Sequence, residues 1–190
     1  MNYPGAFAEF INISEQNLIP LPEGMEFTHA ALTEPAGTSF HALKLAQQAL
    51  SASLSEVNAL VIGGGSIGLL AALFLRSHDC QEIFLCDTNP LRRETALSSG
   101  CCKVFDPLNE PSGLDNSFEL VIDAVGMETT RSLAIRAVRP GGVMMHIGLQ
   151  NGSGNCDFRK ITLGEITVIG TYTYTHNDLE EALLKLSSGA

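Results

Sequence analysis

The chain has 190 residues, of which 11 are basic and 21 acidic, and its formal net charge at pH 7 is −10. Such a charge repels phosphate backbones and anionic membranes, which argues against nucleic acid as a partner. Hydrophobic residues make up 45% of the chain and charged residues 17%, a balance typical of a globular domain and not of a disordered chain.

Residues 57–75 carry no charge and are nearly long enough to cross a bilayer. Glycines at 63–65 and at 68 interrupt this stretch, so a strand, a turn and a buried helix explain it better than a membrane span. The N-terminus lacks the basic region of a secretory signal, and the five cysteines show no C-x-x-C spacing. We therefore expect a cytoplasmic protein with reduced thiols and no contact with membranes.

The first third of the chain has few regular patterns. Residues 1–28 are irregular, although 7–13 resemble a short strand. A helix is expected at about 35–48, where apolar residues recur at helical spacing, and the polar segment 51–56 follows it.

From residue 57 onward, short apolar runs alternate with helical patterns. Asn89, Pro90 and Gly100 mark the ends of one helix. The triplet 140–142 should stop another, and Glu180 should complete a capping-box-like pair in the last one. The crossover at 107–117 is polar, so its helix is reduced to a turn or absent. Strands are expected at 59–62, 83–86, 103–106, 120–125, 143–148 and 166–172, and helices at 67–77, about 90–99, 127–138 and from about 177.

This alternation predicts βαβ units with right-handed crossovers and a parallel sheet. Six strands is the count of the full dinucleotide-binding fold. The expected class is therefore α/β, a doubly wound six-stranded parallel sheet (Rossmann fold) with a short irregular N-terminal segment.

Residues 63–68 fit the pattern G-x-G-x-x-G between a predicted strand and a predicted helix. Gly63 permits the tight turn that leaves the strand, Gly65 lets a pyrophosphate approach the backbone, and Gly68 lets the helix pack closely on the strand. The helix beginning near Ser66 and Ile67 presents unpaired N–H groups to the phosphates. We predict a dinucleotide site here.

Asp87 ends the second predicted strand, 19 residues beyond Gly68. A carboxylate there can accept both hydroxyls of the adenosine ribose and would repel a 2′-phosphate, which predicts NAD and not NADP. The alternative is that Asp87 caps the next helix, although Asn89 is better placed for that. Arg92 could bind a 2′-phosphate, whereas Arg93 is expected to be a solvated residue of the first helical turn.

Two later strand ends are also candidates, because ligands of open α/β sheets lie beyond the carboxyl ends of strands. Ala124, Val125 and Gly126 follow the fourth strand. Ile147, Gly148 and Leu149 follow the fifth. Small residues at these places let backbone approach a flat ring, and simple turn formation is the alternative.

Together these residues resemble the medium-chain dehydrogenase/reductase superfamily, the zinc-containing alcohol and polyol dehydrogenases. The resemblance implies NAD(H)-dependent oxidation of a small-molecule alcohol, with hydride passing to the nicotinamide. The matching segments occur in the expected order at 5–10, 21–24, 30–35, 61–68, 121–126, 139–142 and 169–172.

The same resemblance divides the chain into parts. Residues 1–28 correspond to the end of the family's catalytic domain, and 29–190 to its NAD-binding domain, with the helix at 35–48 as the link. The chain starts too late to hold the family's cysteine and histidine zinc ligands, so no catalytic residue is assigned. We expect the chain to bind cofactor without turnover by itself, and zinc only together with the missing catalytic domain.

Glu34 matches the position at which polyol-type members carry a glutamate that binds zinc or its water. The alternative is that Glu34 only opens the helix, where the dipole favours a negative charge. Polyol specificity rests on this residue alone. By resemblance again, the strand from Ile166 to Tyr172 pairs across a two-fold axis, which predicts a homodimer.

Two other functions share these features. A stand-alone NAD(H)-binding sensor or interaction module would bind cofactor without catalysis. A methyltransferase also uses a glycine turn and an acid after the second strand, but it would end in an antiparallel strand for which no hairpin signal is present. Of the histidines, His41 has no nucleophile near it in sequence, and His146 is expected to be a core residue.

Overall fold

The computed structural model describes residues 5–109 and 112–188. The outermost residues of the two predicted parts, 1–4 and 189–190, and residues 110–111 of the third crossover lie outside the described residues.

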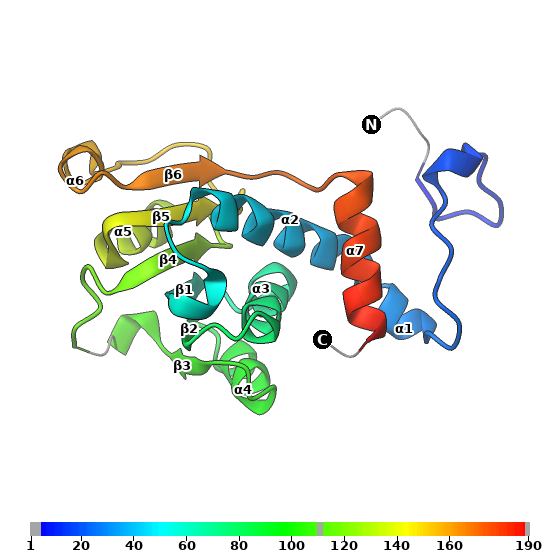
Figure 1. The fold of residues 1–190 in the computed structure, drawn as a ribbon, viewed down its shortest axis with the longest axis horizontal. Helices are drawn as coiled ribbons and strands as arrows, with labels where there is room; N and C mark the ends of the chain where they lie inside the picture. The colour runs from blue at the N-terminus through cyan, green and yellow to red at the C-terminus, as the bar shows by residue number, and fades with distance from the viewer. Residues whose placement is uncertain (1–4, 110–111, 189–190) are drawn as a thin grey trace.

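Six parallel strands form one sheet in the order β3-β2-β1-β4-β5-β6 (Figure 1). This is the doubly wound arrangement that the alternation of elements predicts, and its strand order reverses between β1 and β4. The strands are β1 (Asn58–Ile62), β2 (Glu82–Cys86), β3 (Lys103–Phe105), β4 (Phe118–Asp123), β5 (Val138–His146) and β6 (Thr167–Gly170). The helices are α1 (Phe27–Ala30), α2 (Thr33–Ala49), α3 (Ser66–Ser77), α4 (Pro90–Ser98), α5 (Glu128–Ala137), α6 (Phe158–Leu163) and α7 (His176–Ser187), with 3₁₀ turns η1 (Glu15–Asn17), η2 (Leu54–Glu56) and η3 (Pro107–Asn109).

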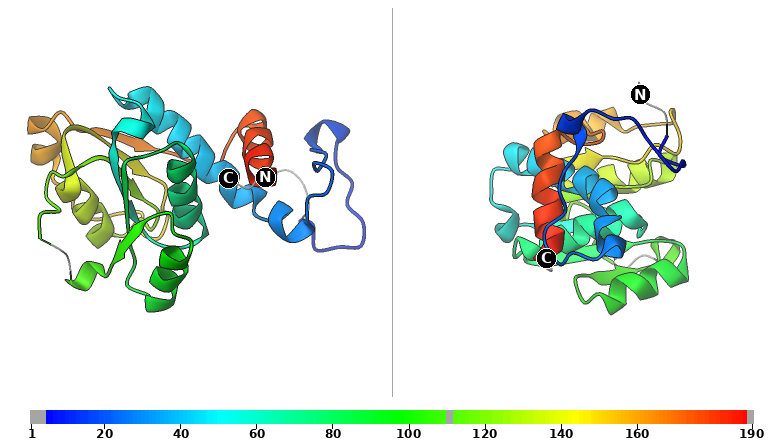
Figure 2. Two further views of the ribbon diagram at one scale, coloured as in Figure 1. Left: turned by 60° about the horizontal axis from the view of Figure 1, so that its bottom comes forward. Right: turned by 90° about the vertical axis from the view of Figure 1, so that its right-hand side faces the viewer.

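The sheet is buried on both faces, as its continuous apolar strands predict. In β1, Ala59 and Val61 join the core formed with α2, α3 and α4, whereas Leu60 and Ile62 join the core formed with α5 and α6. The two groups of helices lie on opposite sides of the sheet (Figure 2). Among the described residues, no helix is both long and apolar enough to cross a membrane, and 57–75 divide between β1 and α3.

Strand register brings four strand ends to one edge of the sheet. Ile62 stands opposite Cys86 on one side and Asp123 on the other, and Asp123 stands opposite His146. The residues that follow these strands therefore lie along one edge of the sheet.

Helix α7 is fastened to α2 by a buried carboxylate. Asp178, only 1% exposed, lies 2.8 Å from His41 Nδ1 and 2.9 Å from Lys44 Nζ. Thr175 caps α7, and its hydroxyl donates to Asp178 at 2.6 Å. Burial opposes ionisation, but the hydrogen bonds from Thr175, Lys44 and His41 outweigh it and hold the pKa of Asp178 well below its usual range.

The described N-terminal residues contain no strand. Residues 7–13 are irregular and largely exposed, so that prediction was wrong; the segment lies beside α1 and α7, away from the sheet (Figures 1 and 2). Phe7 and Phe10 are fully or almost fully exposed, because their apolar pattern meets no neighbouring strand.

Three further boundaries differ from those predicted. Helix α5 ends at Ala137, so the triplet 140–142 does not stop it but lies in β5, where pairing with β4 shifts register. The capping box of α7 is formed by Thr175 and Asp178, while Glu180 faces His176 at 3.3 Å. Strand β6 is shorter than predicted, and helix α6 was not predicted.

Candidate functional site

The glycine turn joins β1 to α3, and each glycine has its own geometry. Gly63 has φ +102°, a conformation that favours glycine, and its N–H donates to Cys86 O at 2.8 Å. A Cβ on Gly68 would lie 1.8 Å from Gly63 O, so a side chain there cannot fit against the turn. Gly65 has open space where its Cβ would point. These positions match the separate tasks that the sequence assigns to the turn and the helix.

Helix α3 begins at Ser66, directly after Gly65. No described side chain caps it, and Ser66 is exposed. The first N–H groups of a helix have no partner within the helix, and they carry the positive end of its dipole. An anion above Gly65 would meet these donors, as phosphates do at other helix N-termini.

Asp87 follows β2 and is tied to the glycine turn itself. Its Oδ2 accepts the N–H of Gly64 at 2.8 Å, its Oδ1 accepts the N–H of Asn89 at 2.7 Å, and the residue is 7% exposed. Asn89 accepts the N–H of Leu91 and caps α4, so Asp87 does not cap that helix. The carboxylate is therefore fixed at the strand end, beside the turn.

The two arginines of α4 differ. Arg92 Nη1 lies 3.5 Å from Asp87 Oδ2, and its side chain is 56% exposed at the rim of the site. Arg93 donates to the carbonyl oxygen of Asp87 at 2.7 Å and lies 3.3 Å from Asp106. Its side chain is only 21% exposed, so the prediction of a solvated Arg93 was wrong. It anchors the chain after β2.

The turns after β4 and β5 press against each other through backbone. Gly126 has φ +80°, and a Cβ there would lie 2.1 Å from Gly148 O; one on Gly148 would lie 2.0 Å from the carbonyl carbon of Val125. Ile147 and Gly148 both donate backbone N–H groups to Asp123 O. The glycines thus permit close contact between two loops, a reason that turn formation alone does not supply.

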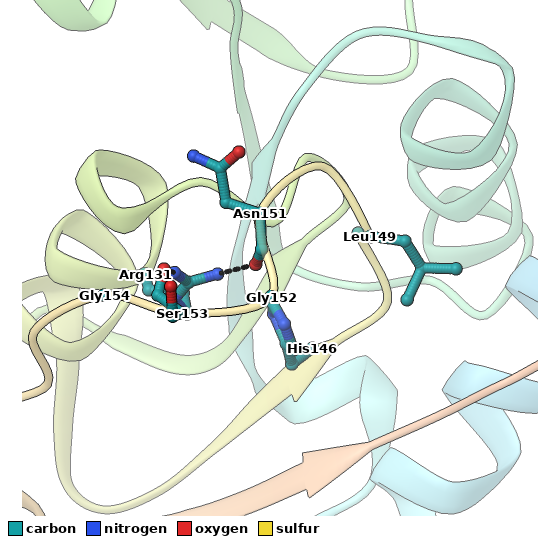
Figure 3. Close-up of a pocket in the computed structure, with 8 residues that line it drawn as sticks. Arg131, His146, Leu149, Asn151, Gly152, Ser153 and Gly154 are labelled. Atoms are coloured by element: carbon teal, nitrogen blue, oxygen red, sulfur yellow. Dashed lines mark hydrogen bonds between the residues drawn. The ribbon is translucent and has the colours of Figure 1, made fainter.

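A cleft of about 540 Å³ opens at this edge of the sheet, where the strand order reverses. It is lined from both sides of the reversal, and four predicted site residues are among its walls: Gly63, Asp87, Arg92 and Val125. Gly148 and Leu149 line a second hollow, of about 250 Å³, together with His146, Arg131 and residues 151–154 (Figure 3). Gly65, Ser66, Ile67, Gly68, Ala124, Gly126 and Ile147 lie in the adjoining turns and line neither hollow.

The sequence profile of zinc-binding dehydrogenases matches residues 66–188. The chain belongs to the zinc-binding dehydrogenase family. The match covers the glycine turn from Ser66 onward and all elements from α3 to α7.

Curated relatives of this family member are dehydrogenases and reductases. An L-threonine 3-dehydrogenase from Rhizobium johnstonii is 27% identical over 90% of the chain and 50% of its own length. A probable D-xylulose reductase A from Aspergillus clavatus is 26% identical over 98% of the chain and 54% of its own length. The chain therefore spans about half the length of the curated relatives it matches.

Solved structures show the same fold. Acetophenone reductase from Geotrichum candidum, in complex with NAD, superposes with a TM-score of 0.80 at 24% identity, over 90% of this chain and 48% of that one. L-idonate 5-dehydrogenase from Escherichia coli gives a TM-score of 0.80 at 21% identity, over 90% and 49%.

Three residues of the site in this family member were missed at the sequence level. Asp123 is fully buried, and its Oδ1 accepts the N–H groups of Val125 and Gly126. His146 is half-buried and lines the smaller hollow, with its Nδ1 3.3 Å from Asp123 Oδ2, so it is not a core residue as expected. Arg131 links both loops. An acid directly before Ala-Val-Gly, as Asp87 follows β2, was a signal for Asp123.

The described residues do not form a zinc site. No three His, Cys, Asp or Glu side chains among them lie close enough to hold a metal ion. Glu34 is exposed in the first turn of α2, where burial and this carboxylate raise the pKa of Tyr174. Glu34 alone does not fit a zinc ion, so we derive no step through one.

Proposed function

We propose that this chain is the NAD(H)-binding part of a zinc-type alcohol or polyol dehydrogenase. The observation that carries the proposal is the open space above Gly65, at the uncapped start of α3, with the fixed carboxylate of Asp87 beside it. Gly63 and Gly68 shape this turn, and Asp87 lines the larger cleft. The parent enzyme would act on a small-molecule alcohol, and Glu34 favours a polyol.

Each residue has a defined task in this proposal. The N–H groups at the start of α3, near Ser66 and Ile67, would hold the pyrophosphate. Asp87 would accept the adenosine-ribose hydroxyls, with Arg92 at the rim. When bound, the nicotinamide ring exchanges hydride with an alcohol carbon.

The loops after β4 and β5 would support the nicotinamide half of the cofactor. A dinucleotide crosses an open sheet where the strand order reverses, so its second half lies on the β4 side. Backbone at 124–126 and 147–149 would face the ring there. Their contact at Gly126 and Gly148 keeps this wall thin.

Asp87 supports a preference for NAD over NADP. Its two oxygens already accept backbone N–H groups, which keeps the carboxylate ionised and correctly placed. A 2′-phosphate would meet this negative charge. The exposed guanidinium of Arg92 reduces the repulsion without removing it, because its nearest nitrogen is 3.5 Å from Asp87.

Residues 1–28 fit the end of a catalytic domain, followed by the NAD-binding domain at 29–190. None of the described residues 5–28 is buried, and Phe7, Phe10 and Phe27 are among the most exposed apolar side chains. Apolar side chains of this size normally pack against protein.

We also propose a cytoplasmic homodimer. Strand β6 pairs only with β5 among the described strands, so its other edge is unpaired, and Val168 on it is 45% exposed. Two such edges can join into one continuous sheet. Cys80, Cys101 and Cys102 are buried thiols, which suits a reducing compartment.

The test is a fluorescence titration of the purified chain with NADH and separately with NADPH. We expect NADH to bind at least about tenfold more tightly than NADPH. S-adenosylmethionine should not compete, and no alcohol should be oxidised by the chain alone. Absence of any NADH response would overturn the proposal, and competition by S-adenosylmethionine would favour a methyltransferase.

A further inference from the structure

The loop that follows β5 has almost no apolar anchorage. Residues 149–155 are all exposed, including Leu149, which is 77% exposed. Backbone bonds hold its start: the N–H of Gln150 donates to Val125 O at 3.3 Å, and that of Asn151 to Gly126 O at 2.9 Å. Polar contacts must therefore fix the position of the rest of the loop.

Arg131, in the first turn of α5, supplies most of these contacts. Its Nη1 donates to Gly126 O at 2.9 Å and to Asn151 O at 3.0 Å, and its Nη2 donates to Ser153 O at 2.7 Å. Figure 3 shows the guanidinium beside Ser153 and Gly154, with Leu149 across the loop from it. One side chain thus joins the turn after β4 to two points of the loop after β5.

The environment of Arg131 matches this task. No carboxylate oxygen among the described residues lies within 4.0 Å of its nitrogens, so the guanidinium is committed to backbone carbonyls. A Cβ on Gly154 would lie 2.8 Å from Nη2, so the loop packs directly on the guanidinium. A planar fork with several fixed donors can hold three carbonyls at once, which a lysine cannot do with the same geometry.

We propose that Arg131 is a positioning residue that pre-forms the wall for the nicotinamide half of the cofactor. Its bonds fix the loop carrying Gly148 and Leu149 against the turn carrying Val125 and Gly126. The inference rests on the proposed NAD(H)-binding function. It goes beyond that function because Arg131 lies outside the glycine turn and the ribose carboxylate.

The location of the clamp predicts a split between two ligands. ADP-ribose contains the adenosine, both phosphates and a second ribose, but lacks nicotinamide. Its contacts would lie with the glycine turn and Asp87, on the other side of the strand reversal. Loss of the clamp should weaken NADH binding and leave ADP-ribose binding nearly unchanged.

The experiment compares Arg131→Met, Arg131→Lys and the control Ser132→Ala in the full chain. Ser132 is exposed on the same helix, and its hydroxyl donates only to Glu128 O. In Arg131→Met we expect the Kd for NADH to rise about tenfold and the Kd for ADP-ribose to change less than about twofold. Arg131→Lys should lie between, and Ser132→Ala should match the wild type.

Hydrogen exchange supplies a readout that does not depend on cofactor. In Arg131→Met, the amides at 150–154 should exchange at least about tenfold faster, while those of β1 should be unchanged. Equal weakening of both ligands, or unchanged NADH affinity, would overturn the positioning role. If the wild type binds neither ligand, the proposed function fails, and the clamp then fails only if exchange at 150–154 is also unchanged.

Discussion

Alanine at Gly65 and at Gly68 should separate binding from folding. Gly65 has φ −73° and open space at its Cβ position, so alanine fits without strain. Gly68 has Gly63 O at 1.8 Å from the same point, where real contacts stay beyond 3.0 Å. The oxygen cannot easily retreat, because the N–H of Gly63 is bonded to Cys86 O at 2.8 Å.

The magnitudes follow from these distances. Gly68→Ala forces α3 and the turn apart by more than 1 Å, an overpacking that should cost about 3 kcal/mol of the free energy of unfolding. For a chain of this length, that cost lowers the Tm by about 6 to 12 °C. Gly65→Ala should change stability by less than about 0.5 kcal/mol. Its methyl group would stand where a phosphate must approach, and the Kd for NADH should rise at least about tenfold.

Thermal unfolding and NADH fluorescence measured on the same preparations provide the assay. Gly65→Ala should melt like the wild type and bind NADH poorly. Gly68→Ala should melt early, and its binding should be measured well below its own Tm. If Gly65→Ala kept full NADH affinity, the argument that the phosphates lie over this turn would fail. A Gly68→Ala protein of unchanged Tm would refute the steric argument.

Asp178→Asn should lower the free energy of unfolding by about 3 kcal/mol at pH 7, because Lys44 loses its buried partner. The depressed pKa of Asp178 means that its stabilisation is present above about pH 4 and lost as the pH falls further, so urea unfolding of the variant should lack that acid-dependent part. Burial raises the pKa of the Cys80 thiol from 9.0 to about 11; the unfolded thiol therefore ionises first, and stability should fall by about 2 to 3 kcal/mol between pH 9 and 11, less steeply in Cys80→Ala. Val168→Lys should convert the dimer to a monomer in sedimentation experiments, whereas a wild-type monomer at micromolar concentration would contradict the proposed β6 interface.

Local patterns were sufficient for the sheet and the glycine turn. The spacing of Gly63, Gly65 and Gly68 and the position of Asp87 depend only on neighbours in sequence, and the structure places them around one strand end. Their roles toward a cofactor remain predictions. Asn89 was recognised as the cap of α4 for the same local reason.

Contacts between distant segments could not be read in the same way. Arg131 bonds to residues 20 and 22 positions away, and nothing in its own helix pattern marks it. His146 was mistaken for a core residue because an apolar strand surrounds it, although it stands at the strand's exposed end. Helix α6 has only six residues and follows a polar, glycine-containing loop, so its apolar period is too short to detect.

The bond from the Gly64 N–H to Asp87 has a consequence for cofactor engineering. Changes of cofactor preference commonly target the acid after the second strand, as though that side chain were independent of the phosphate loop. In this chain, replacing Asp87 would also release a backbone donor in the loop and a second one at Asn89. A switch toward NADP would therefore need a new acceptor for those two N–H groups as well as a new cation.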